Sequence, residues 1–288
     1  MNSLRIPSTI PRDWILSRCS SHAARRGLIG IALALQPALT APAADAPKPL
    51  RALLIAGGCC HDYAHQKDVL KQGLEARAHV VVDILYSTDT TKNVKFEEYG
   101  KGDWAKGYDV VIHDECAGDV KDPGYVDNIL APHRAGVPAV NLHCTMHAYR
   151  NGPDADQWRE FVGIHSIKHD AKKPIDVTVV DPAHPIMAGQ TNYTTIDEEL
   201  YNNVKVFPTT HALMRGKQAT PIGEAVLAWT SPYGPTRVFS TTLGHMTETV
   251  SDPRYLRLVT RGLLWSCDKL NDTYLKPEPK DALKSAAR

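Results

Sequence analysis

Short apolar runs alternate with helical patterns in the first half of the chain, and this alternation limits the choice of fold. The runs are RALLIA (51–56), HVVVDIL (79–85), YDVVIH (108–113) and PAVNL (138–142). Apolar spacing or a proline near a first turn predicts helices at 63–76 and 123–134. Strands that alternate with helices form βαβ units, so we expect a mainly parallel sheet with helices on both faces.

The second half of the chain is less regular. β-like segments lie at 175–180, 204–207, 225–229 and 237–241, and short turns such as SPYGPT indicate an antiparallel extension of the sheet. A last helix is expected at 252–267, with Asp252 as its N-cap and Pro253 at the first helical position. We therefore expect one α/β domain over residues 50–268 and an exposed tail at 269–288.

The composition is that of an ordinary globular protein, since 43% of the 288 residues are apolar and 23% are charged. The formal net charge of +1 gives no electrostatic reason to expect nucleic acid or an anionic membrane as a partner. After residue 44, no apolar segment approaches the ~20 residues that cross a bilayer.

The N-terminus has the pattern of an export signal. Arg25 and Arg26 precede the apolar run LIGIALAL, and the small-residue tract APAADA follows, with cleavage expected after Ala43 or Ala46. We therefore expect residues 1–44 to be a signal peptide and linker, and the protein to be periplasmic or secreted. The paired arginines fit a twin-arginine route in part. A short N-terminal anchor helix is the alternative.

Removal of the signal, which carries Cys19, leaves an odd number of cysteines. An odd number excludes a complete set of intramolecular disulfides, although one or two bridges fit an exported chain. Adjacent Cys59 and Cys60 are not expected to bridge, because the small ring strains the peptide between them. The pairing stays open among Cys59, Cys60, Cys116, Cys144 and Cys267.

Five histidines lie where predicted strands end: His61, His113, His143, His165 and His245. Ligands of parallel α/β sheets bind at the carboxyl ends of the strands, so residues far apart in sequence meet there. Histidine is also the side chain that transfers protons or binds metal near neutral pH. The pattern favours a functional site.

Other polar residues accompany these histidines. Asp62 follows His61 at a helix start, Glu115 follows the third strand, and the segment TIDEELYNNV carries Glu199 and Tyr201. A carboxylate beside a tyrosine suits the binding of sugar hydroxyls or acid–base catalysis. No local metal motif is present, but histidines from separate strands could together hold one divalent cation. The metal ligands would be His61, His143 and His245.

Cys144 follows His143 at the turn after the fourth strand, where many α/β hydrolases display a nucleophile. The Gly-x-Cys-x-Gly spacing is absent, so His143 is the favoured functional residue. An amidase or hydrolase that uses Cys144 is an alternative. A non-catalytic sugar-binding module is a further alternative.

Several segments together resemble the ThuA-like (trehalose utilisation) family: GG…HD after the first strand, NLHCTMH, DPAHPI, EELYNN, and RVFSTTLGH before a final RGLLW helix. The resemblance covers about residues 50–268 and implies a flavodoxin-like, class I glutamine amidotransferase-like three-layer α/β sandwich. The acidic run reads EELYNN where the family has DELY, which leaves open whether Glu198 or Glu199 faces the site. The family's polar site carries over to His61, His143, Glu199 and His245.

The resemblance also implies a role in carbohydrate metabolism, with a 3-keto disaccharide or another glycoside as the small-molecule partner. We expect an enzyme that abstracts a proton next to a carbonyl, with His143 or His61 as base. His245 or a bound metal would stabilise the enolate. The oligomeric state stays open, and a homo-oligomer is compatible with the sequence. The residues expected to bind substrate are Asp62, Glu115, His165 and Tyr201, and His169 in the same loop is the alternative to His165.

Overall fold

The strand order of the central sheet is that of a flavodoxin-like fold. The computed structural model describes residues 47–279, and within them one sheet has the order β2-β1-β3-β4-β11-β10-β9-β6-β7. The strands from β2 to β11 in this order pair in parallel. They are β1 (Leu50–Gly58), β2 (Val80–Tyr86), β3 (Val110–Cys116), β4 (Ala139–Leu142) and β11 (Thr236–Thr241). The predicted fold class is confirmed.

The antiparallel extension continues the sheet beyond β11. Its strands are β10 (Glu224–Tyr233), β9 (His211–Lys217), β6 (Asp176–Val179) and β7 (Tyr193–Thr194). The sequence analysis missed β9, because its arginine, glycine and lysine interrupt the apolar pattern. The segment expected at 204–207 does not join this sheet. It forms β8 (Lys205–Val206), which pairs with β5 (Ile164–His165) in a separate two-stranded sheet.

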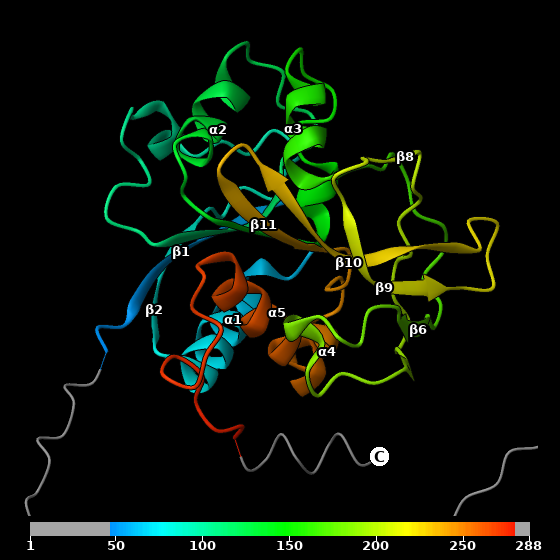
Figure 1. Ribbon diagram of the computed structural model, residues 1–288. Helices are drawn as coiled ribbons and strands as arrows, with labels where there is room; N and C mark the ends of the chain where they lie inside the picture. Colours follow the sequence, from blue (N-terminus) through cyan, green and yellow to red (C-terminus); the bar gives the residue numbers. More distant parts are fainter. Residues whose placement is uncertain (1–46, 280–288) are drawn as a thin grey trace, which may run out of the picture. The chain divides into compact units, whose positions relative to one another are not determined.

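Helices cover both faces of the sheet and complete three layers (Figure 1). On one face lie α1 (Tyr63–Arg77), α4 (Thr247–Ser251) and α5 (Pro253–Ser266), which bury leucines and valines against the parallel strands. On the other face lie α2 (Tyr125–Arg134) and α3 (Ala155–Val162), which pack with Trp158 and Phe161. Each fully buried large apolar side chain contributes about 1.5–3 kcal/mol to this packing.

Two local predictions concern the ends of the chain. Asp252 caps α5 as expected, since its carboxylate accepts a hydrogen bond of 2.8 Å from the Arg254 amide. Residues 269–279, expected to form an exposed tail, are exposed or half-buried and contact the end of α1. Leu275 forms a β-bridge with Ala78, and Glu278 forms ion pairs with Arg77 and Arg257.

The remaining short elements are η1 (Glu97–Gly100), η2 (His143–His147) and η3 (Pro185–Met187). Among residues 47–279, no helix is both long enough and apolar enough to cross a membrane. The predicted signal peptide, Cys19 and residues 280–288 lie outside the described range.

Candidate functional site

Three of the five strand-end histidines meet at the carboxyl edge of the parallel sheet. His61 follows β1, His143 follows β4, and His245 follows β11. The ring centre of His61 lies 4.6 Å from that of His143 and 4.7 Å from that of His245. These strands are neighbours or near neighbours in the sheet, so the topology alone brings residues from three distant segments together.

The backbone at these positions is shaped to present the rings. His143 opens η2 with a φ of 41°, a left-handed conformation that costs a residue with a side chain of order 1–3 kcal/mol. Its Nδ1 atom lies 2.7 Å from the Thr242 carbonyl oxygen, to which it donates, so Nε2 is left to face the site. Gly244, with a φ of 121°, turns the chain after β11 just before His245.

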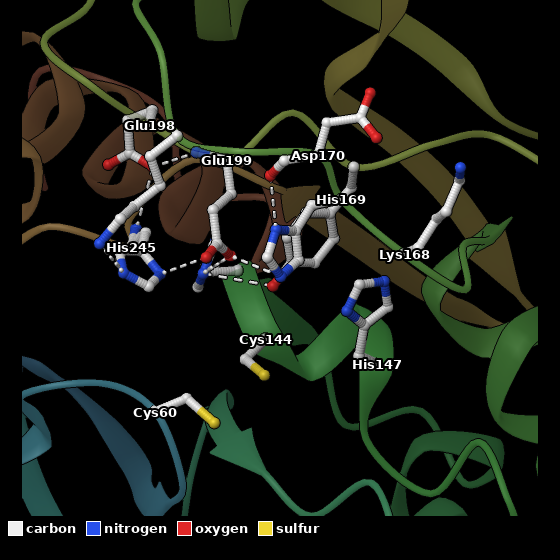
Figure 2. Close-up of polar contacts among 12 residues, drawn as sticks. Cys60, Cys144, His147, Lys168, His169, Asp170, Glu198, Glu199 and His245 are labelled. Carbon is white, nitrogen blue, oxygen red and sulfur yellow. Dashed lines mark hydrogen bonds and ion pairs between the residues drawn. The ribbon is translucent and has the colours of Figure 1, made fainter. Parts of the chain in front are cut away.

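Glu199 lies at the centre of the histidine cluster. Its Oε1 atom is 3.1 Å from His245 Nδ1, and its Oε2 atom is 3.5 Å from Nε2 of both His143 and His169. Figure 2 shows this carboxylate between His245 and His169. A single carboxylate therefore contacts three imidazoles that come from different loops.

The structure distinguishes the two adjacent acids that the sequence left open. The Glu198 carboxylate accepts hydrogen bonds from the backbone amides of His245 and Met246 at 3.3 and 3.2 Å. Glu198 therefore holds the loop that carries His245, whereas Glu199 faces the site.

A cavity of about 270 Å³ opens beside Glu199. The imidazoles of His61, His147 and His169 contribute to its wall, whereas His143 and His245 are not among the lining residues. The lining residues are Cys59, Cys60, His61, Lys92, Cys116, Gly118, Cys144, His147, Arg150, Ile167, Lys168, His169, Glu199 and Tyr201.

The buried groups of the site hold fixed charge states. Burial, together with His143 and His245, lowers the pKa of His61 to about 2, so this imidazole is neutral at ordinary pH. Burial opposes ionisation of Glu199, but the interactions with His143 and His245 outweigh it and lower the pKa of the carboxyl. Burial, with Glu199 and Glu198, raises the pKa of Tyr201 well above its ordinary value. The site thus combines a carboxylate with neutral hydrogen-bond donors.

The sequence left open whether His165 or His169 reaches the site and did not indicate His147, and the structure places both His147 and His169 in the cavity lining. The rings of His147 and Tyr201 stack with centres 4.0 Å apart. Asn202 turns the loop before His169 toward the cavity, because its side-chain oxygen accepts hydrogen bonds of 3.0 Å from the Ile167 and Lys168 amides. Asn202 is the first asparagine of EELYNN, and the second does not make this contact. An asparagine that can fix a loop is the one feature of the sequence that could have indicated His169 as a site residue.

Several expected site residues lie elsewhere. Asp62 is exposed, and its carboxylate pairs with His65 at 2.7 Å. His165 lies on β5, and neither residue lines the cavity. Tyr201 does line it and contacts His143 Nε2 at 3.2 Å through its hydroxyl group.

His113 and Glu115 belong to a buried network and do not reach the rim. Strand β3 extends to Cys116, three residues beyond the predicted end, so both side chains lie within the strand. His113 Nδ1 is 2.9 Å from Glu115 Oε1, and His113 Nε2 is 3.1 Å from His133 Nε2. Glu115 also accepts hydrogen bonds from the hydroxyl groups of Tyr99 and Tyr149. The network satisfies His113 and Glu115 Oε1 inside the core, whereas Glu115 Oε2 is buried without a hydrogen-bond partner.

Two disulfides line the cavity, and one corrects a prediction. Cys59 is bonded to its neighbour Cys60, although adjacent cysteines were not expected to bridge. A sharp backbone turn accommodates this ring, since Cys60 has a φ of 81°. Cys116 is bonded to Cys144, so the Cys144 sulfur is not a free thiol here. Among the described residues, Cys267 is the cysteine outside these bridges.

The fold and site together define a flavodoxin-like α/β protein with a histidine-rich pocket at the carboxyl ends of its parallel strands. The model of the ThuA family, described as trehalose utilisation, matches residues 51–266. The chain belongs to this family, which supports a role in carbohydrate metabolism.

Solved structures of ThuA-like proteins share this fold. One from Parabacteroides merdae is 20% identical, with a TM-score of 0.63, over 81% of this chain and 94% of its own. Another from Bacteroides uniformis is 18% identical, with a TM-score of 0.60, over 79% of this chain and 94% of its own. No curated protein matches the chain in sequence.

Proposed function

We propose that this protein is an enzyme that abstracts a proton next to the carbonyl of an oxidised sugar, such as a 3-keto disaccharide or glycoside. Family membership supports the carbohydrate substrate. The observation that carries the proposal is the contact of the Glu199 carboxylate with His143, His169 and His245 at the edge of a cavity. Such a carboxylate–imidazole arrangement suits proton transfer.

His169 is the base in this proposal. Its Nδ1 atom donates to the Asp170 carbonyl oxygen at 2.9 Å, which leaves the lone pair on Nε2. The side chain is 39% exposed and lines the cavity, so a substrate can approach it. When Nε2 takes a proton, the imidazolium is stabilised by Glu199 Oε2 at 3.5 Å. The more deeply buried His143 contacts the same oxygen and orients the carboxylate.

His61 stabilises the developing enolate oxygen. A histidine whose pKa is about 2 is a weak base, but its neutral ring can donate a hydrogen bond without losing its proton. The Tyr201 hydroxyl stays protonated because burial raises its pKa, and it donates to His143 Nε2, so it fixes that ring. His61 lines the cavity beside Glu199, where it can contact a carbonyl oxygen.

The same cluster also supports a metal-assisted version of this reaction as a second candidate. His61, His143 and His245 each offer a ring nitrogen within 4.8 Å of the other two. His61 Nδ1 is buried and has no hydrogen-bond partner in the structure, and Thr242 fixes the ring of His143. These residues fit one divalent cation. A bound cation would supply Lewis-acid polarisation of the substrate carbonyl.

Elemental analysis of protein purified without chelator tests the metal-assisted version. About one equivalent of metal, lost in His61→Ala but retained in the matched control His65→Ala, would support it. Metal-free protein that binds no divalent cation on titration would reject it. His65 is a suitable control because it is exposed and lies on α1 outside the cavity lining.

Export to the periplasm or the medium is part of the proposal. The signal-like pattern of residues 1–44 supports it, as do the two disulfides, since disulfides persist in oxidising compartments. Cell fractionation after expression of the full chain tests this point. We expect a mature N-terminus at Ala44 or Pro47 outside the cytoplasm, whereas an uncleaved cytoplasmic product would contradict export.

A comparison of oxidised and ordinary sugars tests the reaction class. The account predicts turnover of 3-keto trehalose and related 3-keto glycosides, because only the carbonyl acidifies the neighbouring C–H bond. Trehalose itself should be recovered unchanged. Equal turnover of both sugars would point to simple glycoside hydrolysis, and binding of both without turnover would point to a sugar-binding module.

A further inference from the structure

Four cysteine sulfurs form a continuous row along the cavity. The Cys59–Cys60 disulfide and the Cys116–Cys144 disulfide touch each other, since Cys59 Sγ lies 3.6 Å from Cys116 Sγ. This distance is the contact distance of two sulfur atoms. All four cysteines line the same cavity, and Figure 2 shows Cys60 and Cys144 below the histidine cluster.

The two ends of this row differ in their access to solvent. Cys60 is exposed, whereas Cys59, Cys116 and Cys144 are 7%, 6% and 5% exposed. A reductant in solution therefore reaches the row first at Cys60. Attack on the Cys60 sulfur would release the Cys59 thiolate, which already contacts the second bridge.

We propose that these four cysteines form a thiol–disulfide exchange relay, through which a dithiol reductant acting at Cys60 frees the buried Cys144 thiol. The proposal concerns the cavity wall and does not depend on the reaction proposed for the histidines. It assigns to the chain a reaction with thiols that is separate from sugar chemistry.

The relay balances as a sequence of disulfide exchanges. One thiolate of the dithiol attacks Cys60 Sγ, forms a mixed disulfide with it, breaks the Cys59–Cys60 bond and leaves Cys59 as a thiolate. Cys59 attacks Cys116 Sγ, forms the Cys59–Cys116 bond and releases Cys144, which takes up a proton. The second thiolate of the reductant then displaces Cys60 and closes the oxidised, cyclic dithiol. The products are one protein disulfide, two protein thiols and one oxidised reductant.

A rearranged disulfide is the product that this relay predicts. The full chain is treated with one equivalent of dithiothreitol, quenched with acid, alkylated and digested with trypsin. Cys59 and Cys60 then share the peptide 52–67, in which fragmentation locates the alkylated residue, and Cys116 and Cys144 fall in the peptides 107–121 and 135–150. We expect the first two peptides to be linked through Cys59, with Cys60 and Cys144 alkylated. Loss of one original bridge with the other intact would overturn the proposal.

Two matched variants test the direction of the relay without any reductant. Cys60→Ser leaves Cys59 as a free thiol in contact with Cys116, so Cys144 should become alkylated and Cys59 should be linked to Cys116. Cys59→Ser removes the attacking sulfur, so alkylation of Cys144 should be at least tenfold lower than in Cys60→Ser. Cys267→Ser is the control for thiol reactivity outside the row and should match the wild type. Equal alkylation of Cys144 in the first two variants would overturn the proposal.

Discussion

Glu199 Oε2 lies 3.5 Å from His169 Nε2, and this contact joins an exposed loop to the buried histidine cluster. The Glu199 side chain is 8% exposed, whereas that of His169 is 39% exposed. A proton accepted by His169 therefore arrives at the edge of the cavity and is stabilised by a carboxylate that water hardly reaches. Charge stabilisation is stronger in such a shielded position than at an open surface.

His169→Asn tests the residue that links the cavity to this carboxylate. We expect kcat for a 3-keto sugar to fall by about 10²–10⁴, the usual contribution of a general base. His165→Asn is the matched control, because His165 lies four residues earlier but outside the cavity lining. Steady-state kinetics of both variants measure the loss. An equal loss of activity in His169→Asn and His165→Asn would contradict the assignment of His169 as the base.

The stability of the protein should fall in acid because of His133, which is buried in the core and does not line the cavity. Burial, together with His113, lowers the pKa of His133 to about 3, against an ordinary value of 6.5. The unfolded chain therefore binds this proton first as the pH falls. The stabilisation is complete above pH 6.5 and is lost progressively down to about pH 3.

Urea unfolding at a series of pH values across this window measures the effect. His133 should contribute a slope of about 1.4 kcal/mol per pH unit to the free energy of unfolding. In His133→Gln the slope should be smaller by that amount, even though the variant is less stable at neutral pH. An unchanged slope would show that His133 keeps an ordinary pKa in the folded protein.

Gly262 should tolerate no side chain. A Cβ atom at this position in α5 would lie 2.3 Å from the Phe239 ring on β11, inside the packed core. Gly262→Ala should therefore lower the free energy of unfolding by about 1–3 kcal/mol. Gly102→Ala is the control, because a Cβ there would meet no atom within 4 Å. Chemical denaturation measures the free energy of unfolding of both variants. Equal values would contradict the close contact between α5 and β11.

The sequence predicted the parallel half of the fold because its signals are local. Apolar runs such as RALLIA and PAVNL indicate buried strands, and the strand-end rule then brings His61, His143 and His245 together. The extension was harder to predict. Strand β9 carries charged residues on an open face, and its place in the sheet depends on pairing with β10 and β6.

The individual site residues could be predicted only in part, because the conformation of a loop decides which of its residues reaches the cavity. His165 and His169 are equivalent in sequence terms, and the Asn202 side chain, 33 residues after His169, fixes the loop that brings His169 to the cavity. Glu115 looked like a rim residue because β3 was expected to end at His113. The extra residues of β3 instead place Glu115 within the core.

Hydrogen exchange at the sugar tests the central claim most directly. The protein is incubated with a 3-keto disaccharide in D₂O, and the C–H signals next to the carbonyl are followed by NMR. The account predicts exchange well above the rate in buffer, reduced about a hundredfold in the isosteric variant Glu199→Gln. Exchange at the buffer rate, or exchange unaffected by Glu199→Gln in a folded variant, would contradict it.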